Sequence, residues 1–109
     1  MDAEMDQVVS DLVTEIAPLV EYINELAERV LPEYRLFASR VERGIITDLN
    51  KIEYQLDYML DFCHNDKVLV QFKRVMRYLW QQGHYETVSS YVHAYGRMWD
   101  ENYPVDEEW

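Results

Sequence analysis

The sequence predicts an all-α protein, an antiparallel four-helix bundle with a long N-terminal helical hairpin and two shorter C-terminal helices. Apolar residues recur at helical spacing along most of the chain, and no stretch alternates convincingly as a strand. The chain holds three Gly and three Pro, too few for the tight turns of a β-sandwich or barrel. Short joints between the helical stretches favour antiparallel neighbours.

The length of 109 residues fits one domain, because single folded domains cluster near this size. We expect residues 1–103 to form that helical domain. The acidic residues 104–109, which begin at Pro104, are expected to be a tail.

The first helix is predicted over residues 2–31 by apolar residues at alternating steps of four and three, which is a heptad pattern. Val13, Val20 and Ala27 widen this stripe, so we expect a helix buried in a bundle rather than the narrow seam of a simple coiled coil. The stripe consists of Met5, Val9, Leu12, Ile16, Leu19, Ile23, Leu26 and Val30.

The two prolines near this helix carry different expectations. Pro18 lies on the outer face, where the carbonyl it leaves unpaired meets water, so we expect a kink near Thr14 rather than a break. Pro32 is expected to end the first helix and to start the second.

The second helix is predicted over residues 32–63, because an apolar stripe from Tyr34 to Cys63 keeps its phase across Gly44. One long kinked helix is the preferred interpretation. The alternative is a stop at Gly44 and a new start capped by Thr47 or Asp48.

The third helix is predicted after a turn at residues 64–66 that supplies an N-cap, and residues 82–84 are expected to close it. A fourth helix follows and is expected to fray before Pro104. Apolar faces run from Val68 to Leu79 in the third and from Val88 to Trp99 in the fourth.

Charge is concentrated at the two ends of the chain. Ten Lys and Arg face twenty-one Asp and Glu, which gives a net charge of −11. Residues 1–33 hold nine acids and one base, whereas residues 98–109 hold five acids and no base. This balance disfavours direct binding of nucleic acid, whose phosphates require a basic surface.

Acidic rows predict a binding surface for a basic patch of a partner protein. Like charges four residues apart on one helical face cost about 0.2–0.5 kcal/mol each, so stability alone does not favour them. The alternatives are a solvated face kept for solubility, or pairing with the protein's own basic third helix around Arg74 and Arg77. The acidic residues in question are Asp11, Glu15, Glu21, Glu25, Glu28, Glu53, Asp57 and Asp61.

Aromatic residues and the C-terminus supply further candidate contacts. The tyrosines of the last two helices cannot all face one core, and exposed tyrosines are common in protein interfaces. The acidic end with a terminal indole is a candidate peptide ligand for a pocket rimmed by Lys or Arg. These candidates are Tyr85, Tyr91, Tyr95 and Tyr103, and, in the tail, Asp106, Glu107, Glu108 and Trp109.

Catalytic, cofactor and metal sites find little support in the sequence. Cys63 lies on the apolar stripe, and its neighbour His64 projects about 100° away on a helix, too far round to activate the thiol. Asp61 and His64 give half of a di-metal carboxylate pattern that needs further Glu and His residues. We therefore expect no enzyme, cofactor or metal, and keep a metal-binding bundle or enzyme as a distant alternative.

The sequence thus predicts a non-enzymatic, acidic regulatory module that docks on a basic protein surface. An inhibitor that competes with nucleic acid for that surface, of the kind found in phage and mobile elements, is a special case. The main alternative is a homo-oligomeric structural subunit that pairs through the first helix. A single Cys, the lack of a signal peptide pattern and the lack of a long apolar run predict a cytoplasmic protein with no membrane contact.

Overall fold

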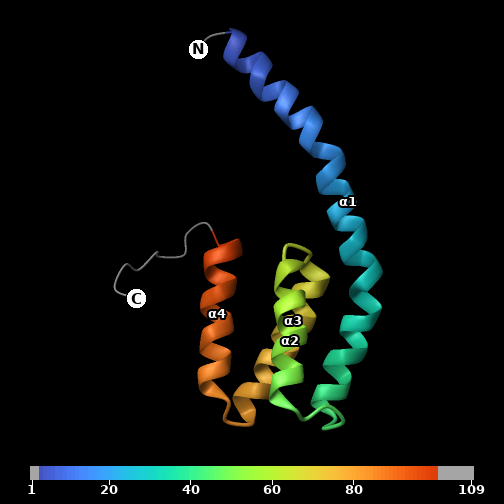
Figure 1. The fold of residues 1–109 in the computed structure, drawn as a ribbon, viewed down its shortest axis with the longest axis vertical. Coiled ribbons are helices and arrows are strands. Elements are labelled where there is room, and N and C mark those ends of the chain that lie inside the picture. Colours follow the sequence, from blue (N-terminus) through green and yellow to red (C-terminus); the bar gives the residue numbers. More distant parts are fainter. Residues whose placement is uncertain (1–2, 101–109) are drawn as a thin grey trace, which may run out of the picture. The chain divides into compact units, whose positions relative to one another are not determined.

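The computed structural model describes residues 3–100, which contain four α-helices and no strand. The helices are α1 (Ala3–Glu42), α2 (Leu49–Asp61), α3 (Asp66–Gln81) and α4 (Tyr85–Trp99), as Figure 1 shows. The predicted all-α class is therefore confirmed. The chain divides into two compact units, one ending at Val30 and one beginning at Leu31. The predicted domain boundary at residue 103 and the tail lie outside the described residues.

The first unit consists, in its described part, of α1 up to Val30, and its apolar stripe is exposed. Met5, Val9, Leu12, Ile16 and Leu19 leave 50% to 57% of their surface open to solvent. The expectation of a buried bundle helix is therefore wrong for this segment. The physical reason is that one helix cannot bury its own apolar stripe, and no second helix belongs to this unit's described residues.

The helix continues without a break through Pro18, as expected. Thr14 Oγ1 donates a hydrogen bond to the Ser10 carbonyl at 2.9 Å, one turn earlier. Such bonds back to the preceding turn are compatible with a helix and often accompany a bend. The kink near Thr14 stays a prediction.

Pro32 does not end the first helix, which corrects the predicted boundary at residue 31. Pro32 is exposed, so the carbonyl that loses its donor there can be hydrated. Leu31, Tyr34 and Phe37 around it are buried. Packing of these side chains outweighs the cost of proline inside a helix, and α1 extends to Glu42.

Gly44 separates α1 from α2, so the preferred single helix over residues 32–63 is also wrong. Gly44 has a φ of +73°, and the N–H of Ile45 donates to the Arg40 carbonyl at 2.9 Å. This is the Schellman arrangement, in which glycine adopts the left-handed conformation that other residues avoid. Asp48 then caps α2 by accepting from the Asn50 N–H at 3.0 Å, which agrees with the alternative that the sequence left open.

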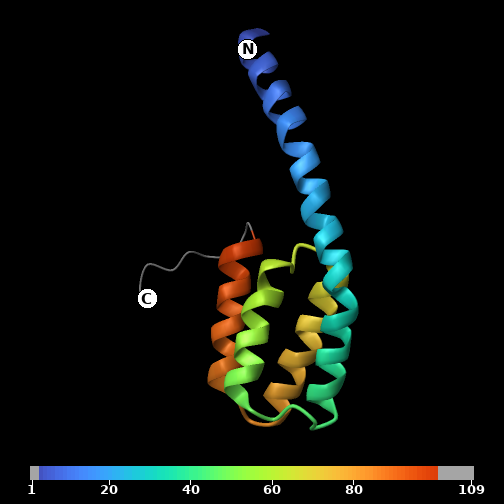
Figure 2. The ribbon, with the colours of Figure 1, turned by 45° about the vertical axis from the view of Figure 1, so that its right-hand side comes forward.

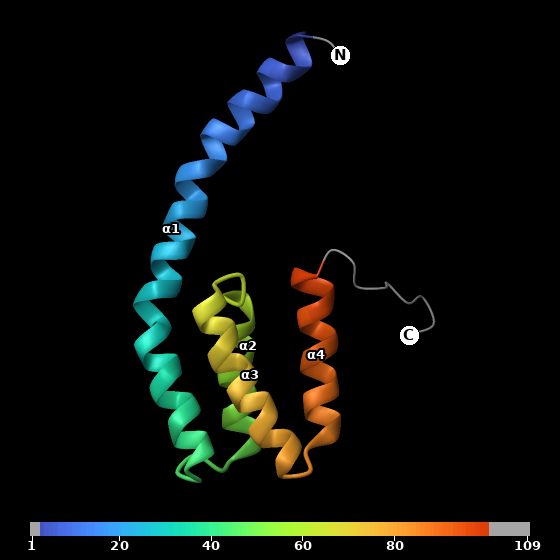
Figure 3. The same ribbon diagram turned by 180° about the vertical axis from the view of Figure 1, so that it is seen from behind.

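The predicted third and fourth helices are confirmed. Asn65 caps α3 by accepting from the N–H groups of Lys67 and Val68 at 2.9 and 3.2 Å. Gly83, at a φ of +87°, ends α3 with the same Schellman pattern as Gly44. Figure 3 shows the turn that joins α3 to α4.

The second unit is a helical bundle made of the C-terminal part of α1 together with α2, α3 and α4 (Figure 2). Helix α3 packs against both α2 and α4. The core of the second unit takes side chains from all four helices, so each short helix packs through its apolar face. The buried apolar residues of this unit include Phe37, Ala38, Val41, Ile52, Leu56, Met59, Cys63, Val68, Phe72, Val75, Met76, Leu79 and Val88.

Candidate protein-binding surface

The acidic residues of the N-terminal segment lie on exposed positions of α1. Asp11, Glu15, Glu21 and Glu25 are all exposed, and so is Glu28. Asp11 Oδ1 accepts a hydrogen bond from Gln7 Nε2 at 2.9 Å, an exposed contact within the helix that leaves its charge in place. Residues 5–25 extend over roughly 30 Å of helix, so these carboxylates form a long negative surface.

The same segment exposes a continuous apolar stripe. We call Met5, Val9, Leu12, Ile16, Leu19 and Ile23 the exposed seam. Ile23 is the least open of the six, with 37% of its surface exposed, and Val13 and Val20 beside the seam are exposed as well. Contiguous exposed apolar surface of this kind marks an interaction site in soluble proteins.

The sequence predicted this stripe as the buried face of a bundle helix and left pairing with a second copy as an alternative, because the same spacing describes both. The signal that could have favoured an exposed seam over a buried one is the charge of the segment. Nine acids against one base among residues 1–33 outnumber the four bases of the third helix, so that helix alone could not neutralise the segment.

The acidic row on α2 is used inside the bundle. Thr87 Oγ1 on α4 donates to Glu53 Oε1 at 3.2 Å. Tyr91 Oη lies 2.7 Å from Asp57 Oδ1 and 2.9 Å from the Glu53 carbonyl oxygen, so its one proton is shared between these two acceptors. These bonds join α2 to α4. Asp61, the third member of the row, is exposed.

The four candidate tyrosines have different surroundings. Tyr91 and Tyr95 are half-buried against Phe72 of α3, with ring centroids 6.3 and 6.4 Å from it. Burial and the bond to Asp57 raise the pKa of Tyr91 well above its ordinary value. Tyr85 is exposed at the start of α4. Its ring packs edge to face against the exposed Trp80, with the two ring centroids 4.5 Å apart. Tyr103 lies outside the described residues, as do Asp106, Glu107, Glu108 and Trp109.

The basic third helix contacts the end of α1 within the second unit. Arg74 forms an ion pair with Glu42 and donates to Ser39 Oγ at 3.2 Å. Lys73 and Arg77 are exposed on the same helix. Arg74 of α3 thus pairs with Glu42, an acid that the sequence did not propose for this pairing.

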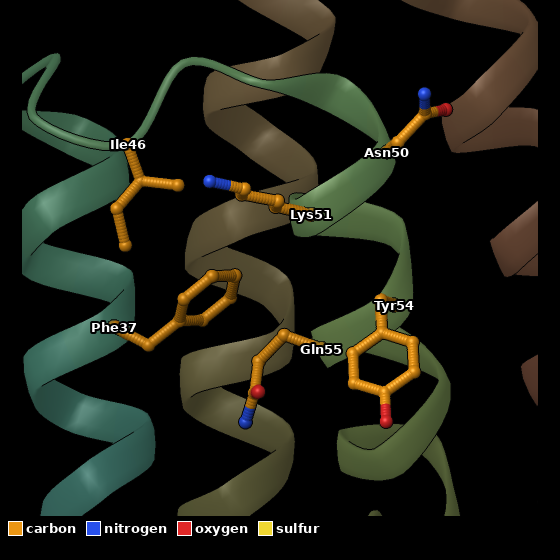
Figure 4. Close-up of a pocket in the computed structure, with 6 residues that line it drawn as sticks. All are labelled: Phe37, Ile46, Asn50, Lys51, Tyr54 and Gln55. Atoms are coloured by element: carbon orange, nitrogen blue, oxygen red, sulfur yellow. The ribbon is translucent and has the colours of Figure 1, made fainter.

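A hollow of about 440 Å³ lies between the end of α1 and α2 (Figure 4). Phe37 and Ile46 form one side of it, whereas Lys51, Tyr54 and Gln55 belong to α2. The hollow is wide open to solvent, with an apolar floor and a single ammonium group at its edge. This set of side chains can contact an apolar group beside an anion, and it pairs no nucleophile with a base.

Cys63 is a buried thiol. Its Sγ donates to the Met59 carbonyl at 3.3 Å, and burial, with a smaller effect of Asp61, raises its pKa to about 12. The thiol is therefore protonated at neutral pH, when it is a poor nucleophile. No cluster of His, Cys, Asp and Glu suited to a metal ion occurs among residues 3–100.

Comparison of the chain with protein-family models, with curated proteins and with solved structures finds no match. None of the helices in the described range combines the length and apolarity needed to cross a bilayer.

Proposed function

We propose that the protein is a non-enzymatic binding module that docks on a basic surface of a partner protein through the acidic residues of its N-terminal segment. The observation that supports this proposal is the exposure of every acidic side chain from Asp11 to Glu25 on one helix whose sequence neighbourhood holds a single base. The bundle of residues 31–100 serves as the folded body of the module.

The acidic residues of the N-terminal segment fit this role better than the acidic residues of α2 do. Glu53 and Asp57 already accept hydrogen bonds from α4, so using them for a partner would compete with the fold. Glu21 and Glu25 are one helical turn apart and face solvent, at a spacing of roughly 6 Å that suits two cationic side chains of a partner. We therefore assign the docking contact to the N-terminal segment.

Charge steering gives this contact a definite salt dependence. Attraction between exposed charges is screened over about 8 Å at physiological ionic strength, so association should slow as salt rises. A protein surface that holds nucleic acid is basic in the same way. Competition with nucleic acid for the partner is the regulatory form of the proposal.

The test begins with capture of partners from lysate at low salt, followed by binding measurements on the purified partner. We expect Glu21→Lys/Glu25→Lys to weaken binding by about tenfold or more, since each exposed pair contributes about 0.2–1 kcal/mol and reversal adds repulsion. The matched control is Glu33→Lys/Glu86→Lys, which makes the same charge change at exposed positions of the second unit.

The control should keep affinity within about threefold, and circular dichroism should show unchanged helicity for both variants. Unchanged affinity of Glu21→Lys/Glu25→Lys would contradict the assigned surface. A partner without a basic surface would contradict the proposal as a whole. Adding a nucleic acid that the partner binds should displace the protein if it acts as a competitor.

A further inference from the structure

We infer that the exposed seam is the interface at which two copies of this chain pair as a parallel, two-stranded coiled coil. The seam is a run of six apolar residues that are all exposed on one helix, and no helix of the same unit covers it in the described part of the chain. A second copy is the occupant that its own residues specify.

The residue types along the seam indicate two strands. In the heptad, Val9, Ile16 and Ile23 take the a positions, and Met5, Leu12 and Leu19 take the d positions. β-branched residues at a and leucine at d favour parallel dimers, whereas other distributions of Ile and Leu favour trimers or tetramers. The seam follows the dimer pattern throughout, with methionine in place of leucine at its first d position.

The flanking positions select a parallel orientation. In a parallel pair each g residue faces the e residue of the next heptad, so Val8 faces Val13 and Glu15 faces Val20 of the second copy. These pairs bring no like charges together. In an antiparallel pair that aligns the whole seam, g faces g, and Glu15 would oppose Glu15 of the second copy.

Apart from Asp6, which takes an e position beside Met5, the remaining acids lie away from the seam. Asp11 and Glu25 occupy c positions and Glu21 an f position, all on the outer side of a two-stranded coil. They stay in water when two copies pair. The dimer therefore leaves Asp11, Glu21 and Glu25 open for docking, with Glu15 alone of the docking acids beside the seam, and the two proposals stand independently.

The area is sufficient for a stable dimer. The six seam residues with Val13 and Val20 are mostly about half exposed, and at roughly 80 Å² each a pair of copies would bury roughly 1,300 Å². Specific interfaces bury about 1,200–2,000 Å², so the seam reaches this range without help from the second unit.

The salt dependence of binding distinguishes this interface from the acidic docking contact. Both copies carry the same negative segment, so screening should strengthen pairing as salt rises, whereas docking on a basic partner should weaken. Failure of one proposal is thus distinguishable from failure of the other.

The test is sedimentation equilibrium of the full chain at micromolar concentration in about 50 and 500 mM NaCl. We expect a mass of twice 13.2 kDa, with tighter association at the higher salt. Leu12→Glu/Leu19→Glu should be a monomer at the same concentrations. The matched control, Val70→Glu/Val92→Glu, adds the same charges at two exposed apolar positions outside the seam and should remain a dimer.

Orientation is tested by Met5→Cys in a Cys63→Ala background. A parallel pair brings the two new thiols together, so mild oxidation should cross-link most of the protein, whereas an antiparallel pair leaves them about 27 Å apart. A monomer for the unmodified chain at both salts, a trimer or larger assembly, or a dimer that survives Leu12→Glu/Leu19→Glu would overturn the inference. A dimer that forms without the cross-link would overturn the parallel arrangement.

Discussion

Tyr91 and Cys63 show how single side chains define the second unit. The single proton of the Tyr91 hydroxyl is shared between the Asp57 carboxylate and the Glu53 carbonyl, so one residue of α4 contacts two acceptors on α2. Cys63 fills a buried position two residues after the end of α2 and donates a hydrogen bond to the Met59 carbonyl. In both residues burial favours the neutral form and raises the pKa, so the folded state should lose stability at alkaline pH.

The pKa of Cys63 leads to a prediction about alkaline stability. Folding raises it from an ordinary 9.0 to about 12, mainly through burial. Between these values the unfolded chain releases the thiol proton and the folded chain keeps it, so stability should fall as pH rises above about 9. The raised pKa of Tyr34 adds a similar loss that begins near its ordinary value of 10.0.

Cys63→Ala should remove the first part of this loss. Urea unfolding midpoints measured from pH 7.5 to pH 10 should decline from about pH 9 in the unmodified protein, and about one pH unit later in the variant. Equal declines would show that the thiol ionises as easily in the folded state as in the unfolded one.

At the scale of helices, glycine decides where α1 and α3 end. Both Gly44 and Gly83 adopt positive φ, and each lets the following N–H reach the carbonyl five residues earlier. A stripe that keeps its phase across a glycine does not reveal this, because apolar periodicity reports which side of the chain is buried and not whether the helix continues. Pro18 and Pro32, by contrast, do not end a helix, because packing and solvent exposure allow α1 to continue past both.

Gly83→Ala should destabilise the protein by about 1–2 kcal/mol. A Cβ at Gly83 would meet no atom within 4 Å, so the cost comes from the left-handed backbone and not from a clash. Chemical denaturation compares it with Ser89→Ala, an exposed change inside α4 that should alter stability by less than about 0.5 kcal/mol. A neutral Gly83→Ala would mean that the turn can relax to a negative φ.

At the scale of the whole molecule, stability should be unevenly distributed between the two units. Isolated helices are marginal in water, and the seam of α1 buries little within one copy of the chain. The four helices of the second unit share a core, so their backbone amides should open together only on global unfolding.

Hydrogen exchange should therefore depend on protein concentration in one part of the chain alone. We expect amides of residues 5–23 to exchange rapidly well below the dimer dissociation constant and to become protected well above it, while α3 stays protected throughout. Mass spectrometry of peptides from the two regions provides the measurement, with α3 as the internal control. Protection of residues 5–23 that is independent of concentration would point to stabilisation within one chain.

The amino-acid sequence by itself determined the all-α class, the turns at residues 64–66 and 82–84 that bound the third helix, and the acidic character of the N-terminal segment, because each of these follows from local chemistry and periodicity. Only the tertiary structure decided that Pro32 lies inside α1, that Gly44 ends it, and that Glu53 and Asp57 hold α4. It also decided that the seam faces solvent. The reason is the same in each case: an apolar stripe requires a partner surface, and which surface covers it depends on residues far away in the chain or in another copy of it.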